Sequence, residues 1–421
     1  MTLIKTSLQN GIAVTFRLIA LLWLNKVLAV YVGPAGYAAI GNFQNAVQMI
    51  VTFASGAINT GVVKYTAEYY EQEEELRRLW RNAGTIAVIG SVITGLILFF
   101  FSRQMARWFL NDEKYHTVFI WLSLSLVFFV MNALLLAVLN GRKQIAHYIA
   151  CSIAGSLFSM VVTSLLAIKF GLHGALTALA IHPSVSFIVT LYICHRLDWF
   201  NLRLFFGRLE KRFVINLVKY AAMALTSAIC VPTSHILIRT HIVDALGVES
   251  AGYWEAMWRI SASSLMLVTT TLSLYYLPRL SEINDAREIR KEVYQGYKII
   301  FPIAAISGFA IYLSRDIIIR LLFTPDFMPM RELFALQMVG DTLKIGSWII
   351  SYLMLGKAMV NIFIVSEIVF ALSFYCLTCL FISLVGLKGV ALAHAVNYAL
   401  YWIVMEIYVG KTLFKCKARD L

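Results

Sequence analysis

Charged side chains occur inside several of the most apolar segments of this 421-residue sequence. An ionised side chain at the centre of a lipid bilayer costs about 2.5–3.5 kcal/mol on insertion scales, so it must face protein or water. Such residues therefore indicate a polar interior. They fall into three chemical groups, which are basic residues able to bind an anion, acid–base pairs, and isolated acids able to carry a coupling ion.

The basic residues are candidates for lining a cavity. They are Arg17, Lys26, Lys64, Lys219 and Arg259. Arg17 and Lys26 are nine residues apart, about 180° on an ideal helix, so both face one cavity only if the helix bends. Alternatively, the Lys26 ammonium reaches the lipid headgroups. The same snorkelling is the competing explanation for Lys219, near the start of its helix.

Two acid–base pairs have the spacing of one helix face. Glu255 precedes Arg259 by four residues, and Asp341 precedes Lys344 by three. Residues three or four apart are neighbours on a helix surface, and an acid placed N-terminal to its base is the better arrangement. Each pair is either a structural ion pair within a helix bundle or part of a ligand or coupling site.

Glu367 and Glu406 are isolated acids in two further apolar segments. They are either protonated and satisfied by neighbouring hydroxyls, or they carry a coupling proton or Na⁺, and the sequence leaves both open. The intramembrane acids all fall in the second half of the chain, while the first half has only basic residues there. A cavity lined by Arg and Lys attracts an anion, and a phosphate or pyrophosphate fits best.

The elements that position these residues are apolar helices. Sixty percent of the residues are hydrophobic, 14% are charged and the mean hydropathy is +0.76, which excludes a water-soluble globular protein of this length. A spanning helix needs about 20 apolar residues. We predict an all-α integral membrane protein with about twelve spans, over residues 8–32, 37–61, 83–101, 117–139, 148–169, 174–194, 214–238, 252–277, 298–314, 332–355, 359–384 and 389–410.

The sequence contains two related halves. Gly171–Ala175 recurs as Gly386–Val390 at a shift of 215 residues, and Ala35–Tyr37 recurs as Ala251–Tyr253 at a shift of 216. Both matches lie at the boundaries of apolar runs. Six helices per half is an even number, so the two repeats insert in the same orientation and are parallel.

A basic segment separates the halves. We predict an N-terminal six-helix lobe over residues 1–194, a cytoplasmic linker over 195–213, a C-terminal lobe over 214–410 and a cytoplasmic tail over 411–421. With both termini in the cytoplasm, the cytoplasmic segments hold 22 of the 36 Lys and Arg residues, which satisfies the positive-inside rule. The net charge of +13 therefore reflects topology, and no nucleic-acid partner is expected.

The sequence gives little indication of catalysis or of metal binding. The extramembrane segments are too short for a soluble catalytic domain, and we predict no catalytic residue, no metal site and no cofactor beyond coupling to H⁺ or Na⁺. Cys376 and Cys379 form a C-x-x-C without polar neighbours, so they are interpreted as small buried hydrophobes. We expect a transporter.

Four segments carry a resemblance to a known family, and they are Asn25–Gly36, Lys64–Tyr65, Tyr276–Ser281 and Leu333–Lys344. With the twelve-helix layout, they resemble the Wzx flippases of the polysaccharide transporter branch of the multidrug/oligosaccharidyl-lipid/polysaccharide exporter superfamily. The resemblance runs nearly end to end and is strongest to the enterobacterial common antigen and O-antigen flippases. Val339-Gly340-Asp341 closes the most specific segment.

The resemblance implies a function and a location. Such proteins move undecaprenyl-pyrophosphate-linked oligosaccharides from the cytoplasmic to the periplasmic leaflet of the bacterial inner membrane by alternating access. Arg17, Lys26, Lys64 and Lys219 match basic positions of the family, and Asp341 with Lys344 matches its acidic and basic pair. An O-antigen polymerase and a chain-length regulator are the partners expected from the family.

Arg259 departs from the common antigen flippase, where we expect an uncharged residue. This departure favours an O-antigen unit over the common antigen unit, lipid III, as the substrate. A multidrug or cation antiporter of the same superfamily is the alternative function, although the basic first half would repel cationic drugs. An integral membrane polymerase or glycosyltransferase would need a long outer loop or a D-x-D motif, and the sequence has neither.

Overall fold

The protein is described from a computed structural model, which covers residues 3–272, 276, 279–280, 283, 285–357 and 359–415. Every element within these ranges is a helix, which confirms the all-α prediction. Seven helices in the described ranges are long and apolar enough to cross a membrane, or eight if the bent pair α2 and α3 is one span. The chain is therefore a multi-pass membrane protein.

The predicted spans lie on helices, with two differences. Span 37–61 crosses a break at residues 55–58, and spans 148–169 and 174–194 belong to one long helix. The long helices are α1 (Leu3–Tyr31), α2 (Gly33–Ala54), α4 (Glu73–Phe100), α6 (His116–Gly141), α7 (Ile145–His195), α8 (Lys211–Leu246), α9 (Val248–Thr271), α11 (Ala286–Leu313), α13 (Phe334–Gly356), α14 (Val360–Val385) and α15 (Lys388–Lys415). The short ones are α3 (Asn59–Glu68), α5 (Ser102–Leu110), α12 (Arg315–Leu322) and the 3₁₀ helices η1 (Glu113–Tyr115), η2 (Leu202–Phe205) and η4 (Pro325–Leu333). The last residues of the predicted span 252–277, and residues 416–421 of the predicted tail, lie outside the described ranges.

Helix α7 contains two predicted spans and breaks between them at Gly171. Gly171 has φ 57° and ψ −135°, and Gly386, which ends α14 in the second half, has φ 65° and ψ −142°. This backbone region is accessible essentially to glycine alone. The repeated glycine motif therefore makes the same turn in both halves.

The second glycine of each motif allows the backbone to approach itself closely. A Cβ at Gly174 would overlap the carbonyl oxygen of Leu166, and a Cβ at Gly389 would overlap that of Phe381. Each carbonyl lies eight residues before its glycine. The repeated Gly171–Ala175 motif thus has one physical reason, which is a tight turn between consecutive helices.

Two charged segments are continuous with longer helices. Residues 64–81 contain the end of α3 and the first turns of α4, and residues 286–298 form the first turns of α11. A short helix follows each of the longer helices, α5 after α4 and α12 after α11. Arg107 in α5 and Arg320 in α12 are the basic residues of these last turns.

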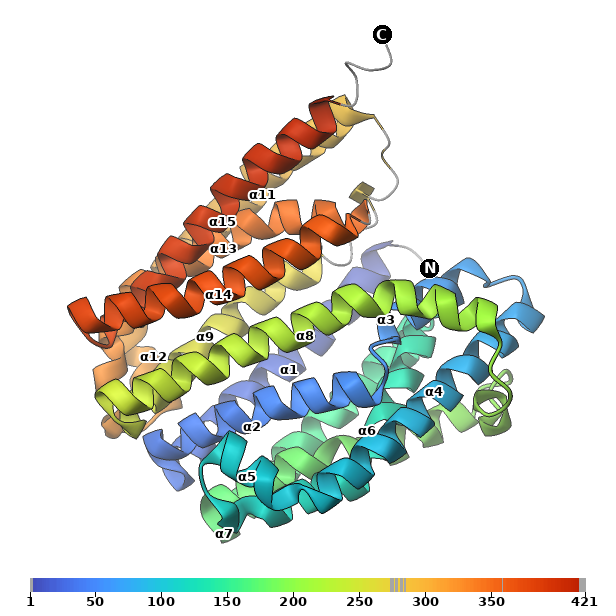
Figure 1. Cartoon of the computed structure of the whole chain (residues 1–421), viewed down its shortest axis with the longest axis horizontal. Helices are drawn as coiled ribbons and strands as arrows, with labels where there is room; N and C mark the ends of the chain where they lie inside the picture. The colour runs from blue at the N-terminus through green and yellow to red at the C-terminus, as the bar shows by residue number, and fades with distance from the viewer. Residues whose placement is uncertain are drawn as a thin grey trace. The chain divides into compact units, whose positions relative to one another are not determined.

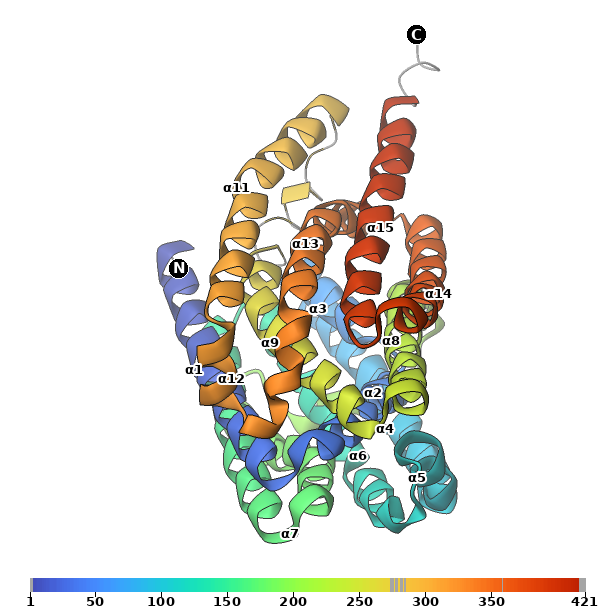
Figure 2. The same cartoon turned by 90° about the vertical axis from the view of Figure 1, so that its left-hand side faces the viewer.

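Contacts divide the chain into two compact units. The first unit comprises Met1–Val32 and Ala39–Pro232, and the second comprises Gly33–Ala38 and Thr233–Leu421. In the first unit α6 packs against α3, α4 and α7, and α1 packs against α7, as Figure 1 shows for α4, α6 and α7. In the second unit α13 packs against α11 and α15, which Figure 2 shows side by side, and α14 packs against α15. The lobe and linker boundaries stay a prediction.

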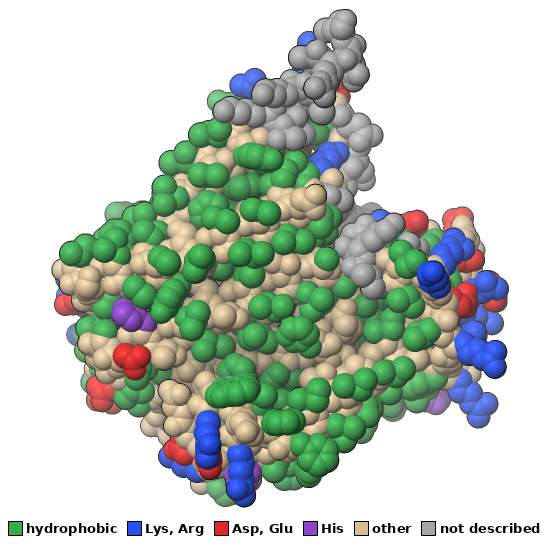
Figure 3. Space-filling model, viewed as in Figure 1, with side chains coloured by type: hydrophobic (Ala, Val, Ile, Leu, Met, Phe, Trp, Pro, Cys, Tyr) green, Lys and Arg blue, Asp and Glu red, His purple; other side chains and the backbone are tan. Residues whose placement is uncertain are grey.

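The surface has the distribution expected of a membrane protein. On the visible flank of the first unit, hydrophobic side chains cover the long helices, while charged side chains gather near α5 and near the start of α4 (Figure 3). Exposed apolar residues on α4 include Ile93, Leu96 and Phe100. The apolar flank is suited to lipid, and its charged ends are suited to the two interfaces.

Candidate functional site

A buried carboxylate lies between two guanidinium groups in the second unit. The Oε2 atom of Glu255 is 2.6 Å from an Nη2 of Arg239, and its Oε1 is 3.0 Å from Nε of Arg259. The side chains of Arg239, Glu255 and Arg259 are 1%, 4% and 13% exposed. One acid and two permanent cations give this triad a net charge of +1.

Aromatic rings hold both arginines. The guanidinium of Arg239 is 5.3 Å from the ring centre of Trp254, and that of Arg259 is 5.2 Å from the ring centre of Tyr37. Tyr37 is fully buried and packs edge-on against Phe327 of η4, with 5.1 Å between the ring centres. Cation–π contacts orient a guanidinium without neutralising it. The triad therefore keeps its charge.

Arg239 is not among the site residues predicted from the sequence. The predicted span ends at residue 238, which places Arg239 in an outer loop, but α8 continues to Leu246 and buries it. Ile242 and Val243 follow Arg239 at helical spacing and pack into the core, so the apolar periodicity beyond residue 238 was the available signal. Glu255 and Arg259 are brought together as their four-residue spacing predicts.

A second buried group surrounds Asp341. Its Oδ1 is 3.0 Å from Nε2 of His394 on α15 and accepts a hydrogen bond of 3.2 Å from the side-chain amide of Gln337. His394 is fully buried, and the sequence analysis did not select it. A Cβ at Gly340 would overlap the His394 ring, so this glycine permits the contact.

Lys344 lies one turn after Asp341 and is enclosed by aromatic rings. Its Nζ is 4.5 Å from the ring centre of Trp258 and 5.1 Å from those of Trp348 and Tyr398. The side chain is buried, and Asp341 and Glu367 are close enough to interact with its charge electrostatically. Trp258 precedes Arg259 directly, so α9 connects the two groups. We call the triad and the Asp341 group together the charged core.

The remaining predicted residues lie elsewhere. Glu406 is exposed on α15, whereas Glu367 on α14 is partly buried beside the charged core. Arg17 is exposed and Lys26 partly buried, and α1 runs through both as a single helix. Lys64 is exposed, 4.0 Å from the carboxylate of Glu68.

Lys219 belongs to α8, but its side chain lies outside the described residues. The structure thus gathers the predicted residues of the second unit, except Glu406. Arg17, Lys26, Lys64 and Lys219 belong to the first unit, and their role in lining a cavity stays a prediction.

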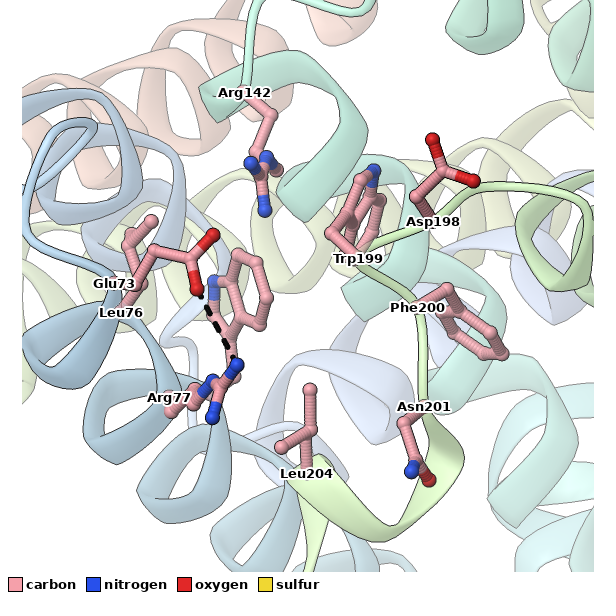
Figure 4. A pocket seen from close by; sticks show the side chains of 10 residues that line it. Glu73, Leu76, Arg77, Arg142, Asp198, Trp199, Phe200, Asn201 and Leu204 are labelled. Carbon is pink, nitrogen blue, oxygen red and sulfur yellow. Dashed lines mark hydrogen bonds and ion pairs between the residues drawn. The ribbon is translucent and has the colours of Figure 1, made fainter.

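A separate pocket of about 600 Å³ lies in the first unit, between the start of α4, the end of α6 and the segment that contains η2. Arg142 enters it from one side and Arg77, paired with Glu73 at 3.3 Å, from the other (Figure 4). The Arg142 guanidinium lies 4.9 Å from the ring centre of Trp199. None of the predicted site residues lines this pocket.

The charged core can do two things chemically. Two guanidiniums that share one carboxylate can accept a further anion, since planar guanidinium groups match phosphate oxygens. A carboxyl group that contacts an imidazole can hold a mobile proton. The triad is thus suited to an anion, and the Asp341 group is suited to a proton.

Relatives and solved structures match nearly the whole chain. The family described as "Polysaccharide biosynthesis protein" matches residues 7–284. The "Lipid III flippase" of Escherichia coli (strain K12) and that of Shigella flexneri are each 28% identical over 406 residues, which is 96% of this chain and 97% of each relative.

The similar solved structures share the fold. An inward-facing multidrug resistance MATE family transporter of the MOP superfamily has a TM-score of 0.77 at 16% identity and covers 97% of this chain and 96% of its own. The lipid II flippase MurJ, in an inward closed conformation, has a TM-score of 0.74 at 15% identity, covering 97% and 87%. A mutant of the Vibrio cholerae MATE transporter VcmN has a TM-score of 0.75 at 14% identity, covering 98% and 97%. The predicted MATE-like fold is confirmed.

Proposed function

The chain belongs to the polysaccharide biosynthesis protein family, and from this premise we propose that it is a flippase for lipid-linked oligosaccharides. Its substrate is an undecaprenyl-pyrophosphate-linked O-antigen unit, which it moves from the cytoplasmic to the periplasmic leaflet of the inner membrane by alternating access. The observation that carries the proposal is the buried triad of Arg239, Glu255 and Arg259, with its net positive charge.

The triad is suited to a pyrophosphate because of its burial. A positive charge that is desolvated inside an apolar body attracts an anion more strongly than one in water. Arg259 is the more exposed of the two arginines, so its guanidinium is the group that meets the substrate first. The oligosaccharide would follow the pyrophosphate, while the polyprenyl tail stays in lipid.

Two substrates fit the same chemistry. Arg259, which is absent from the pattern that we expect in the common antigen flippase, favours the O-antigen unit. The similarity to two proteins named lipid III flippase favours the common antigen unit, lipid III, as the alternative. Both carry a pyrophosphate, so the charged core does not separate them.

The proposal also covers the topology and the partners of the protein. It acts without catalysis, has both termini in the cytoplasm, and works with an O-antigen polymerase and a chain-length regulator.

A multidrug or cation antiporter is the second candidate function, favoured by the TM-score of 0.77 with a MATE transporter. The positive charge of the triad argues against cationic drugs.

The test is the leaflet distribution of undecaprenyl-pyrophosphate oligosaccharide in cells depleted of this protein. We expect accumulation on the cytoplasmic side that the wild type relieves and Arg259→Gln does not. Arg320→Gln, which removes an exposed arginine in the same unit, is the matched control and should behave as wild type. An unchanged distribution, together with lost tolerance to organic cations, would replace the proposal by drug export.

Expression in two strains identifies the substrate. One strain lacks its O-antigen flippase and the other lacks its lipid III flippase. Restored O-antigen display in the first strain alone supports the O-antigen unit, and restored common antigen in the second alone supports lipid III. Surface polysaccharide is measured on gels in both strains.

A further inference from the structure

Asp341 and His394 form a titratable pair inside the second unit. Asp341 is 4% exposed and His394 is fully buried, and 3.0 Å separates Oδ1 of the acid from Nε2 of the imidazole. Within the described residues, Oδ2 of Asp341 and Nδ1 of His394 have no hydrogen-bond partner. An unsatisfied buried polar group costs about 1–3 kcal/mol. The pair therefore carries a stability cost, as expected of a functional group.

Four helices place charged or titratable groups around this pair. They are His235 on α8, Lys344 on α13, Glu367 on α14 and Tyr398 on α15, and Arg239 on α8 lies near His235. The aromatic rings of Trp258 and Phe374 lie 5.5 and 5.8 Å from the His394 ring and shield it. In this enclosure, gaining or losing one proton changes a local charge that water does not screen.

The neighbours of Asp341 favour a proton over a metal cation. His394 and Gln337 present nitrogen atoms to the same carboxylate oxygen, and Lys344 adds an ammonium one turn away. Hard cations such as Na⁺ prefer oxygen ligands to nitrogen donors. A proton needs only the carboxylate and the imidazole.

Helix packing holds the two groups in place. The imidazole lies against the backbone of α13 at Gly340, where a side chain would displace it. Lys344 lies on the next turn of the same helix, where the rings of Trp258 and Trp348 enclose its amine. The acid and the imidazole are thus held against each other by packing, with an amine close by.

We propose that Asp341 and His394 together bind and release the proton that drives transport, with the buried Lys344 one turn away on the same helix as Asp341. This inference rests on the proposed flippase function. It selects Asp341 from the acids that the sequence analysis named as coupling candidates, adds His394, and assigns the coupling ion as H⁺ instead of Na⁺.

The first experiment needs no substrate. Infrared difference spectra of the full-length protein in lipid nanodiscs are recorded between about pH 5 and about pH 9, a range that covers the ordinary histidine pKa. We expect the protonated carboxyl stretch of a buried acid, which disappears as the pH rises. The band should be absent in Asp341→Asn, and its midpoint should move in His394→Gln, which keeps an amide near the acid.

Controls separate this pair from other acids. Glu332→Gln removes an exposed acid of the same unit and should leave the band unchanged. Replacing K⁺ by Na⁺ at constant pH should not move the midpoint. The proposal is overturned if Asp341→Asn retains the band, if no pH-dependent carboxyl band exists, or if Na⁺ displaces the titration.

The second experiment measures transport in proteoliposomes with a polyprenyl-pyrophosphate-linked disaccharide as the probe. A pH gradient should drive the probe into one leaflet in the wild type and in Glu332→Gln, and a Na⁺ gradient should not. Asp341→Asn and His394→Gln should lose this response while still equilibrating the probe without a gradient. If the wild type equilibrates the probe between leaflets but a pH gradient does not set the direction of transport, the proton coupling alone is refuted. If the wild type does not equilibrate the probe at all, the flippase function is refuted, and the infrared result then decides the proton site.

Discussion

At the scale of single residues, the buried cations are stabilised by specific partners. Glu255 contacts both Arg239 and Arg259, so one carboxylate compensates two guanidiniums. Removing one member of a buried ion pair leaves an uncompensated charge, which is far more costly than losing an exposed pair. This difference makes the triad testable by stability measurements as well as by transport.

Glu255→Gln should destabilise the protein strongly. The change removes the carboxylate that the two guanidiniums share, and breaking buried pairs costs about 3–5 kcal/mol. Glu74→Gln, which removes the exposed partner of Arg78, is the control and should cost about 0–1 kcal/mol. Thermal unfolding in detergent measures both variants. Equal melting temperatures for the two would contradict the buried triad.

Outside the membrane spans, Arg331 lowers the pKa of Asp316 by hydrogen bonds of 2.6 and 3.1 Å. Since the folded-state pKa is below the usual aspartate value, the contact stabilises above that value and is lost as the pH falls through the lowered pKa. Arg331→Gln should raise the Asp316 pKa towards its ordinary range. A carboxyl NMR titration measures the shift, and an unchanged titration would show that the contact does not form in solution.

At the scale of elements, glycines determine where helices turn and how closely they pack. Gly171 and Gly386 make equivalent turns, and Gly340 lets α15 approach α13 at His394. The turn glycines could be identified from the sequence repeat, because a backbone conformation restricted to glycine is a local property. The role of Gly340 depends on a residue 54 positions later in the chain and was not predictable from spacing.

Gly171→Ala and Gly386→Ala should each destabilise the protein by about 1–3 kcal/mol, because alanine is strained in this backbone region. Gly155→Ala is the control. Gly155 is within helix α7, where a Cβ would meet the Ser186 hydroxyl at an ordinary 3.4 Å, and alanine favours the helix. Thermal melting compares the three variants, and a neutral effect at both turn glycines would contradict the repeated turn.

At the scale of the whole molecule, the proposed function requires the triad to recognise an anion while an apolar exterior faces lipid. Arg259 is the member of the triad that retains some exposure, and it is also the residue at which we expect the common antigen flippase to be uncharged. Removing the Arg259 guanidinium should therefore have its clearest effect on the affinity for the pyrophosphate.

Arg259→Gln should weaken binding of undecaprenyl pyrophosphate by about tenfold or more, because a charge-assisted hydrogen bond contributes about 1.5–3 kcal/mol. Native mass spectrometry of detergent-solubilised protein measures the affinity, and Arg320→Gln should bind as wild type. Undecaprenol, which has no pyrophosphate, should bind both variants equally. Unchanged pyrophosphate affinity in Arg259→Gln would remove this residue from the binding site.

The sequence by itself determined the class of the protein, its twelve helical segments and the repeat of its halves. Apolar runs of spanning length and glycine turns are local properties, so no knowledge of packing is needed to recognise them. The pairs with a local spacing, Glu255 with Arg259 and Asp341 with Lys344, were predictable for the same reason.

Only the tertiary structure decided which charges share a site. Arg239 meets Glu255 across 16 residues, and His394 meets Asp341 across 53, each on a different helix. Such contacts depend on which helix faces pack together, and apolar helices carry little information on this in their own periodicity. The physical reason is that packing of whole helices, and not local spacing, brought the second arginine and the histidine to the acids.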